Sequence, residues 1–339
     1  MAQVRFGLAP NLYPPELIFQ AAELCEQSGL DALWLADHVV AFGVRRFAAV
    51  DAWSTLAALA VKTSRIGLGT CVSDPHRRHP ETLAQIVATV DHLSRGRVIL
   101  GLGPGESMNL DPFGVEWSSP VSRLEEAVQV IKALWTQEEV SFHGKHFKLR
   151  EAVLDLKPFQ KPHPPIWFGA NSPRTVRLAA QLGDGWIPIA RGPDVYRDQL
   201  MTLEAHARAL GRDPEAITKG LFTYIGVAPE IEQARSLFEV PAKVVYVFNE
   251  YPEHHFARVP LTRANAAQVL SKALQLDIGL ERLRERLGIP LGTPEDCVGI
   301  LEKYVEAGAR YFILAPLTRP EEFLKVAQFC VDLVIPELS

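Results

Sequence analysis

Apolar residues gather in short continuous runs, and each run is followed by a longer segment in which apolar residues recur at helical spacing. Val4 to Ala9, Asp31 to Ala36 and Arg65 to Thr70 are such runs, and Val98 begins a fourth. A short apolar run without polar alternation is typical of a strand that is covered on both faces. The alternation of such strands with helical segments predicts a parallel sheet.

Proline and acidic residues mark where the predicted helices begin. Pro15 and Pro80 stand at helix starts, where proline is favoured because its missing N–H would have no partner. The segments Asp51 to Lys62 and Arg123 to Trp135 have helical spacing. Together these segments fill the gaps between the first strands and complete a regular series of strand–helix units.

The second half of the chain continues this rhythm with two interruptions. Further strands are predicted at Pro164 to Gly169, Asp184 to Ile189, Gly220 to Val227 and Tyr311 to Ala315. Glu139 to Leu149, with Gly144 near its middle, predicts a β-hairpin. Helical patterns without a strand occupy residues 230 to about 290, and further helices are predicted from Thr293 and from Pro320 to Val334.

Eight strands with intervening helices predict an α/β protein built as one (β/α)8 TIM barrel. The chain, residues 1 to 339, is then a single domain with a helical insertion after strand seven, at about residues 230 to 290. A doubly wound parallel sheet is the alternative that the pattern leaves open.

Composition narrows the classes of partner. Of the 339 residues 47% are hydrophobic, which allows a sizeable core, and the net charge of -5 offers no basic footprint for nucleic acid or anionic lipid. The chain has neither a secretory signal pattern nor an apolar run of about 18 residues, so we expect a cytoplasmic protein with a small-molecule substrate and no membrane partner. The four cysteines form no CxxC pair, so neither a disulfide framework nor a metal site is expected.

Candidate chemistry follows from the barrel, because active-site groups lie at the C-terminal ends of barrel strands. His38 comes directly after the second strand, beside Asp37, and its ordinary pKa suits a general acid or base near neutral pH. A loop histidine that bonds a backbone carbonyl is the alternative reading.

The stretch Arg97 to Asn109 combines an apolar strand with three glycines and one acid. Gly101, Gly103 and Gly105 remove side-chain bulk where the backbone approaches a flat ligand or takes a positive φ. Glu106 follows them among apolar and small residues, where burial would raise its pKa and make it a proton donor. A solvated carboxylate that caps the next helical turn explains the same residue.

Asn171-Ser172-Pro173 begins a helix after the fifth strand, and its N–H groups and helix dipole suit a phosphate. An ordinary N-cap is the alternative. Neither GxxxxGK[ST] nor a GxGxxG after the first strand is present, which argues against nucleotide triphosphates and a Rossmann nicotinamide site. Arg77 and Arg78 could meet a polyanionic tail or be solvated.

Four motifs at strand ends resemble the luciferase-like superfamily of flavin and deazaflavin oxidoreductases. They are LADH at 35–38, IGLGTCVSDP at 66–75, GRVILGLGPGESMNLDPFG at 96–114 and GDGW at 183–186. Within the superfamily the chain is most similar to the branch that uses coenzyme F420, as in methylenetetrahydromethanopterin reductases and F420-dependent glucose-6-phosphate dehydrogenases. An acid after the Gly-x-Gly of strand four, here Glu106, favours F420 over FMN.

The resemblance implies a coenzyme ring in the mouth of the barrel, and it implies roles for named residues. Glu106 and His38 match the proton-handling acid and histidine of the sugar-phosphate dehydrogenases. Cys71-Val72 matches a non-prolyl cis peptide that supports the ring, and Gly169 to Ser172 with Thr175 match the phosphate-binding segment. The implied coenzyme contacts are Asp37, Cys71, Val72, Asp74, Asn109, Gly169, Ala170, Asn171, Ser172 and Thr175.

The function that the resemblance implies is hydride transfer between F420 and a pterin, alcohol or ketone. The alternatives are an FMN-dependent luciferase-like monooxygenase and a non-catalytic flavin or deazaflavin carrier. A homodimer is expected from the family.

Overall fold

The computed structural model describes residues 3–10, 14–42, 46–255, 258–259 and 262–338. A ring of parallel strands forms its centre. In chain order the strands are β1 (Arg5–Leu8), β2 (Ala32–Leu35), β5 (Gly67–Thr70), β6 (Val98–Leu102), β9 (Ile166–Phe168), β10 (Gly185–Trp186), β11 (Thr218–Val227) and β13 (Tyr311–Pro316).

The ring has no free edge. β1 pairs with both β2 and β13, and β10 pairs with both β9 and β11, all in parallel register. The predicted TIM barrel is confirmed, and closure of the ring excludes the open doubly wound sheet. β12 (Leu291–Gly292) extends β11 outside the ring.

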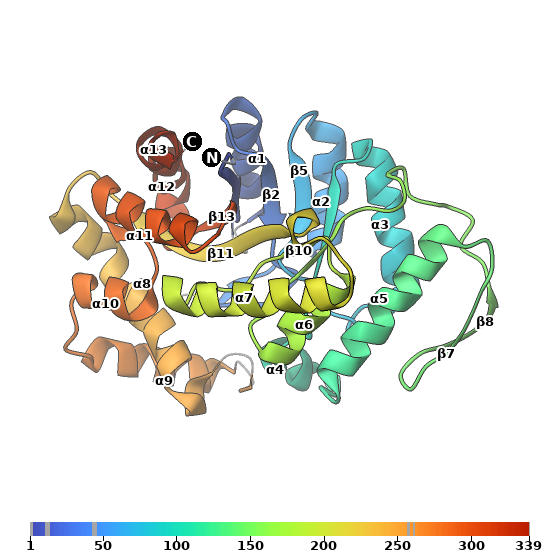
Figure 1. Cartoon of the computed structure of the whole chain (residues 1–339). Helices are drawn as coiled ribbons and strands as arrows, with labels where there is room; N and C mark the ends of the chain where they lie inside the picture. The colour runs from blue at the N-terminus through green and yellow to red at the C-terminus, as the bar shows by residue number, and fades with distance from the viewer. Residues whose placement is uncertain (1–2, 11–13, 43–45, 256–257, 260–261, 339) are drawn as a thin grey trace.

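Helices cover the outside of the barrel, and the two chain ends lie side by side at the upper edge of Figure 1. The helices are α1 (Pro15–Gln27), α2 (Ala52–Lys62), α3 (Pro80–Ser94), α4 (Ser107–Leu110), α5 (Pro120–Thr136), α6 (Pro173–Leu182), α7 (Pro193–Ala209), α11 (Pro294–Glu306), α12 (Phe323–Phe329) and α13 (Ile335–Leu338). Short 3-10 turns are η1 (Asp111–Phe113), η2 (Pro214–Ala216), η3 (Pro252–His254) and η4 (Pro320–Glu322), and η5 (Cys330–Val334) is a π-helix.

Capping residues explain where several helices begin. The Asp51 carboxylate accepts the Ser54 N–H at 2.8 Å at the start of α2, and the Thr293 hydroxyl caps α11. Each such cap satisfies an N–H that would otherwise lack a partner, and it is worth about 1 kcal/mol.

Large aromatic side chains fill the inside of the barrel. The indole of Trp34 lies 5.0 Å from that of Trp167, ring centre to ring centre, and its N–H donates to the Tyr311 hydroxyl at 3.2 Å. Gly7 and Gly69 stand on the two strands beside Trp34, and a Cβ atom at either would lie within 2.6 Å of its ring. The interior of the barrel is therefore a packed core and not an open channel.

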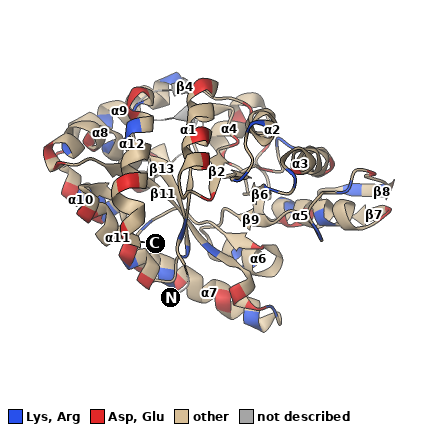
Figure 2. Ribbon diagram, turned by 90° about the horizontal axis from the view of Figure 1, so that it is seen from above, with Lys and Arg blue, Asp and Glu red and all other residues tan. Residues whose placement is uncertain are grey.

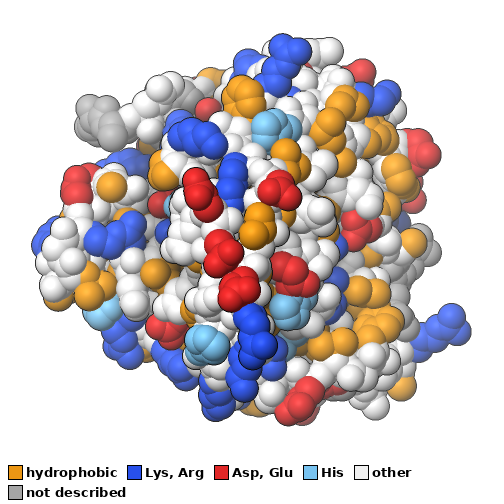
Figure 3. Space-filling model, turned by 90° about the vertical axis from the view of Figure 1, so that its right-hand side faces the viewer, with side chains coloured by type: hydrophobic (Ala, Val, Ile, Leu, Met, Phe, Trp, Pro, Cys, Tyr) orange, Lys and Arg blue, Asp and Glu red, His pale blue; other side chains and the backbone are white. Residues whose placement is uncertain are grey.

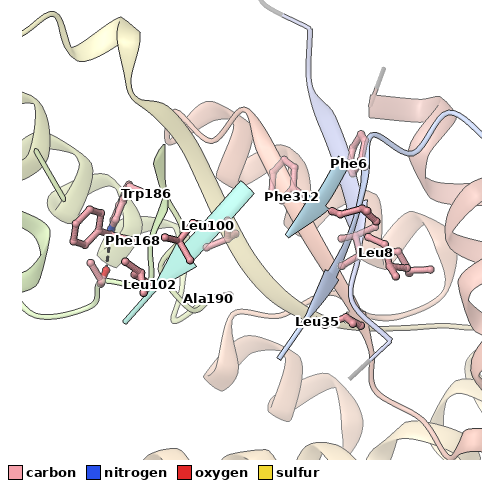
Figure 4. Close-up of a cluster of buried hydrophobic side chains, with 14 of the residues drawn as sticks. Phe6, Leu8, Leu35, Leu100, Leu102, Phe168, Trp186, Ala190 and Phe312 are labelled. Carbon is pink, nitrogen blue, oxygen red and sulfur yellow. Dashed lines mark hydrogen bonds between the residues drawn. The ribbon is translucent and has the colours of Figure 1, made fainter. Parts of the chain in front are cut away.

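Alternate residues of the same strands point outward and pack against the helices (Figure 4). Phe6 and Phe312 stack at 5.6 Å, and Leu8, Leu35 and Leu100 are each no more than 3% exposed. This second layer joins the strands to the surrounding helices and makes the largest apolar cluster.

Three excursions leave the strand–helix series. β7 (Val140–His143) and β8 (Lys148–Ala152) form the predicted hairpin, which projects at the right of Figure 1. β3 (Val40–Phe42) and β4 (Arg46–Ala48) form a second hairpin directly after His38, which the sequence did not predict. After β11 come α8 (Ile231–Glu250), α9 (Arg263–Gln275) and α10 (Leu280–Leu287), at the predicted position of the insertion.

A separate apolar cluster, here called the insertion cluster, joins these helices to the barrel loops. It contains Val40 of β3, Met108 of α4, and residues of α8 and α9 that include Val247 and Val269. The insertion therefore packs directly against the two segments that follow β2 and β6.

Charged side chains of both signs are interspersed on the outer helices (Figure 2), and one face of the molecule mixes acidic, basic and apolar side chains (Figure 3). No helix in the described part of the chain has the length and apolar character needed to cross a membrane.

Gly101→Ala tests the tightest backbone approach in the barrel. A Cβ atom there would lie 1.7 Å from the carbonyl oxygen of Thr70. Neither group can move without shifting a strand, so we expect a loss of at least about 3 kcal/mol in the free energy of unfolding. Gly29→Ala is the matched control, because a Cβ there meets nothing within 4 Å. Equal denaturant midpoints for the two variants would contradict this account.

Candidate active site

Two loops at the C-terminal end of the barrel bring His38 and Glu106 together. His38 follows β2, Glu106 follows β6, and the Nε2 atom of His38 lies 3.6 Å from the Oε2 atom of Glu106. The side chains remain 20% and 25% exposed, so both are reachable from solvent. Glu106 precedes α4, but its side chain makes no capping hydrogen bond.

Each member of this pair has a buried polar atom without a hydrogen-bond partner among the described residues, Nδ1 of His38 and Oε2 of Glu106. Burial raises the pKa of Glu106, and the nearby His38 imidazole only partly opposes that rise. A carboxyl group that keeps its proton to higher pH is suited to donate it. Unpaired buried polar atoms are rare in folded proteins, and here they are consistent with a site built for a ligand.

Asn109 ties the segment after His38 to the loop that carries Glu106. Its Oδ1 atom accepts the backbone N–H of Val39 at 2.9 Å and that of Val40 at 3.2 Å. Asn109 is buried, and its amide contributes one of the smaller effects that oppose the rise in the pKa of Glu106. The resemblance assigns Asn109 to the coenzyme, but its amide oxygen is already engaged by the protein.

Both carboxylate oxygens of Asp37 are engaged by neighbouring side chains. Arg78 donates two hydrogen bonds to them at 2.6 and 2.8 Å, and the Ser73 hydroxyl donates a third at 2.7 Å. Burial opposes ionisation of Asp37, but Arg78, Arg77 and Ser73 outweigh it and hold its pKa below the usual value. Asp37 is only 2% exposed, so this geometry favours a supporting role for its carboxylate.

Asp74 is likewise bound within the protein. Its Oδ1 atom accepts the backbone N–H groups of His76 and Arg77 at 2.9 Å each, and its Oδ2 atom accepts Nε of Arg77 at 2.8 Å. Arg77 also donates to the backbone carbonyl of Asp37. Arg77 and Arg78 are therefore bound to buried acids, and neither is free to meet an anionic tail.

The Cys71-Val72 peptide is cis, as the resemblance predicts. Val72 lies in a cradle of glycines, since a Cβ atom would come within 2.5 Å of it at Gly103 and within 3.1 Å at Gly169. Gly101 and Gly103 thus make room for the chain itself, whereas the sequence indicated room for a ligand or a positive φ. Gly105, with φ of 80°, meets the second of those reasons.

Ser172 and Thr175 form a reciprocal cap at the start of α6. The Thr175 N–H donates to Ser172 Oγ at 3.2 Å, and the Ser172 N–H donates to Thr175 Oγ1 at 3.0 Å. The Oδ1 atom of Asn171 accepts the N–H of Ile189, and the Ala170 carbonyl accepts the Trp186 indole N–H. The ordinary cap is therefore present, and a phosphate-binding role for this segment stays a prediction.

Tyr224, near the end of β11, lies in this region and was missed from the sequence. Burial raises its pKa to about 12, and the charges of Glu106 and Cys71 add to the rise. Its ring packs edge-on against Phe222 at 5.5 Å. The alternate aromatic residues of strand seven were the available signal, because alternate residues of a barrel strand share the interior face.

No cluster of three or more His, Cys, Asp or Glu side chains is placed to hold a metal ion within the residues that the structure describes.

A family model described as luciferase-like monooxygenase matches residues 3–311. The chain belongs to this family. The resemblance drawn from the four strand-end motifs is thereby confirmed, and the chain is an oxidoreductase of the luciferase-like family.

The chain is also similar to individual proteins. The chain is 32% identical to a phthiodiolone/phenolphthiodiolone dimycocerosates ketoreductase of Mycobacterium tuberculosis, over 93% of this chain and 92% of that protein. It is 27% identical to 5,10-methylenetetrahydromethanopterin reductase of Methanolobus tindarius, over 86% and 87% of the two chains. An F420-dependent secondary alcohol dehydrogenase solved with an F420-acetone adduct has the same fold, with a TM-score of 0.82, 24% identity and 99% coverage of both chains.

Asp37→Asn tests the supporting role of the buried acid. Because the substitution leaves the Arg78 guanidinium without its main carboxylate, we expect a loss of roughly 2–4 kcal/mol in the free energy of unfolding at pH 7. The pKa of Asp37 is lowered in the fold, so its contribution is present above its ordinary value of 3.8 and is lost as pH falls through the folded pKa. Chemical denaturation from pH 7 down to pH 3 measures this change.

Asp194→Asn is the control for that measurement, since Asp194 is 91% exposed and pairs with Arg197 at the surface. Its effect on stability should be small at every pH. A stable Asp37→Asn variant that has only lost coenzyme binding would return Asp37 to the role implied by the resemblance.

Proposed function

We propose that the chain is an F420-dependent oxidoreductase that transfers hydride between this deazaflavin and a ketone or secondary alcohol. The observation that carries the proposal is the pair of Glu106 and His38, 3.6 Å apart at the barrel mouth, each with a buried polar atom that no group in the described part of the chain satisfies. The aromatic ring of Tyr224 and the side chain of Val72 offer apolar surface beside this pair for a planar ring system.

The chemistry of hydride donation and acceptance is supplied by the deazaflavin when it is bound. The residues of this chain manage protons and position. The imidazole of His38 exchanges a proton with the substrate oxygen, which is carbonyl in the ketone and hydroxyl in the alcohol. Burial raises the pKa of the Glu106 carboxyl group, so Glu106 keeps its proton to higher pH than an exposed carboxyl group does and can supply that proton beside the coenzyme ring.

One similarity supports this choice of substrate class, and another supports a second candidate. The ketoreductase relative, at 32% identity over nearly the whole chain, favours a carbonyl substrate. A methylene-pterin is the second candidate, because a methylenetetrahydromethanopterin reductase also matches most of the chain. A homodimer stays a prediction.

F420 and FMN are separated by a titration of the purified apoprotein with each compound, followed by fluorescence. We expect micromolar or tighter binding of F420 and weaker binding of FMN, because Glu106 stands where the resemblance to F420-dependent enzymes has an acid after the Gly-x-Gly. Preference for FMN, together with oxygen-dependent turnover in the presence of a flavin reductase, would replace this proposal by the monooxygenase alternative. Reduced F420 is then offered ketones and methylene-pterin separately to distinguish the two substrate classes.

The Glu106→Gln variant should lose activity and gain stability at high pH. Loss of a general acid lowers kcat by about 10²–10⁴-fold. The pKa of Glu106 is raised in the fold, so the native carboxyl group costs stability as pH rises from its ordinary value of 4.5 through the folded pKa. The variant should therefore unfold at a higher temperature than the native protein at pH 8, and the difference should vanish toward pH 4.

Glu302→Gln provides the control for this substitution, since Glu302 is exposed on α11. It should leave both kcat and the unfolding temperature unchanged. A Glu106→Gln variant with native activity would show that Glu106 handles no proton in the reaction.

A further inference from the structure

Two arginines lie one turn apart on α6, close to its capped N-terminus. Arg174, Arg177, Leu178 and Gln181 are spaced so that they share one face of the helix. This face lines a groove of about 190 Å³, which is walled on one side by Val121 and Glu125 of α5 and on the other by His206 of α7. We call this feature the α6 groove.

The arginines of the α6 groove differ from the two arginines of the neighbouring helix α7. Arg174 and Arg177 are exposed, and neither forms an ion pair with another described residue, whereas Arg197 and Arg208 on α7 each pair with an acid three or four residues away. Glu125 is the acid among the groove's lining residues, so the two guanidinium groups leave an excess of positive charge. This charge is available to a ligand.

The groove extends along α6. It runs from Arg174, two residues after Ser172, to Gln181, which at 1.5 Å per residue is a length of about 10 Å. It begins at the segment where a coenzyme phosphate is predicted. A chain of anionic groups that leaves such a phosphate would therefore meet Arg174 first and Arg177 one turn later.

We propose that the α6 groove binds the oligoglutamate tail of F420 through Arg174 and Arg177. This inference rests on the proposed function, since only the deazaflavin carries such a tail. The arginines at 77 and 78, which the sequence offered for this task, are bound to Asp37 and Asp74 and cannot perform it. The tail carboxylates stay near water in this groove, so each ion pair is modest and sensitive to salt.

The test compares F420 forms with zero, two and six glutamates, all of which keep the phosphate. The dissociation constant of each form is measured by fluorescence quenching with the native protein at low and high salt. An exposed ion pair contributes about two- to fivefold in affinity, so we expect the six-glutamate form to bind roughly tenfold more tightly than the form without glutamate at low salt. High salt should remove most of that difference.

The double variant Arg174→Gln/Arg177→Gln should bind all three forms alike, with the native dissociation constant for the form without glutamate. Arg282→Gln/Arg286→Gln makes the same change in net charge at exposed positions of α10, and it should keep the native dependence on tail length.

Native affinity that does not vary with tail length, or an unchanged dependence in the Arg174→Gln/Arg177→Gln variant, would overturn the α6 groove proposal alone. Failure of all three forms to bind the native protein would overturn this proposal and the proposed function together.

Discussion

The whole active end of the barrel depends on one close contact, in which the backbone of β6 at Gly101 lies against the backbone of β5 at Thr70. The missing side chain lets the Thr70 carbonyl oxygen approach, and the Thr70 hydroxyl and the Ser73 N–H both donate to the Gly101 carbonyl at 2.9 Å. Ser73 is thereby fixed where its hydroxyl reaches Asp37. This contact sets the position of Val72, the position of the ion pairs around Asp37 and the course of the loop that carries Glu106.

The pKa values of two acids in this region, Asp37 and Glu106, are shifted in opposite directions. Asp37 is surrounded by donors, which lower its pKa, so its charge strengthens the fold. Glu106 is only partly compensated, so burial raises its pKa and its carboxyl group weakens the fold at neutral pH. The Asp37–Arg78 ion pair ties down the segment that carries His38, whose Nε2 atom lies 3.6 Å from the Oε2 atom of Glu106.

Much of the architecture could be predicted from local pattern. Buried parallel strands appear in the sequence as unbroken apolar runs. A few residues are enough to indicate a capped helix start, as at Asp51 and Thr293. The hairpin after His38 was not predicted, because no local periodicity marks it. Tyr224 was missed although it alternates with Phe222 along β11, because that alternation indicates an interior position and not a place at the site. Arg77 and Arg78 were left open between solvent and an anionic ligand. Their partner Asp37 lies about 40 positions earlier in the chain, and only the closed barrel brings them together.

The insertion cluster has a consequence for which substitutions the chain tolerates. Val40 and Met108 belong to the segments that follow β2 and β6, yet they pack against α8 and α9, which lie outside the strand–helix series. Apolar contacts lack the strict geometry of hydrogen bonds, so exchanges among these side chains are tolerated when total volume is kept. Exchanges of this kind can therefore alter the helices of the insertion while the segments that carry His38 and Glu106 keep their places in the barrel.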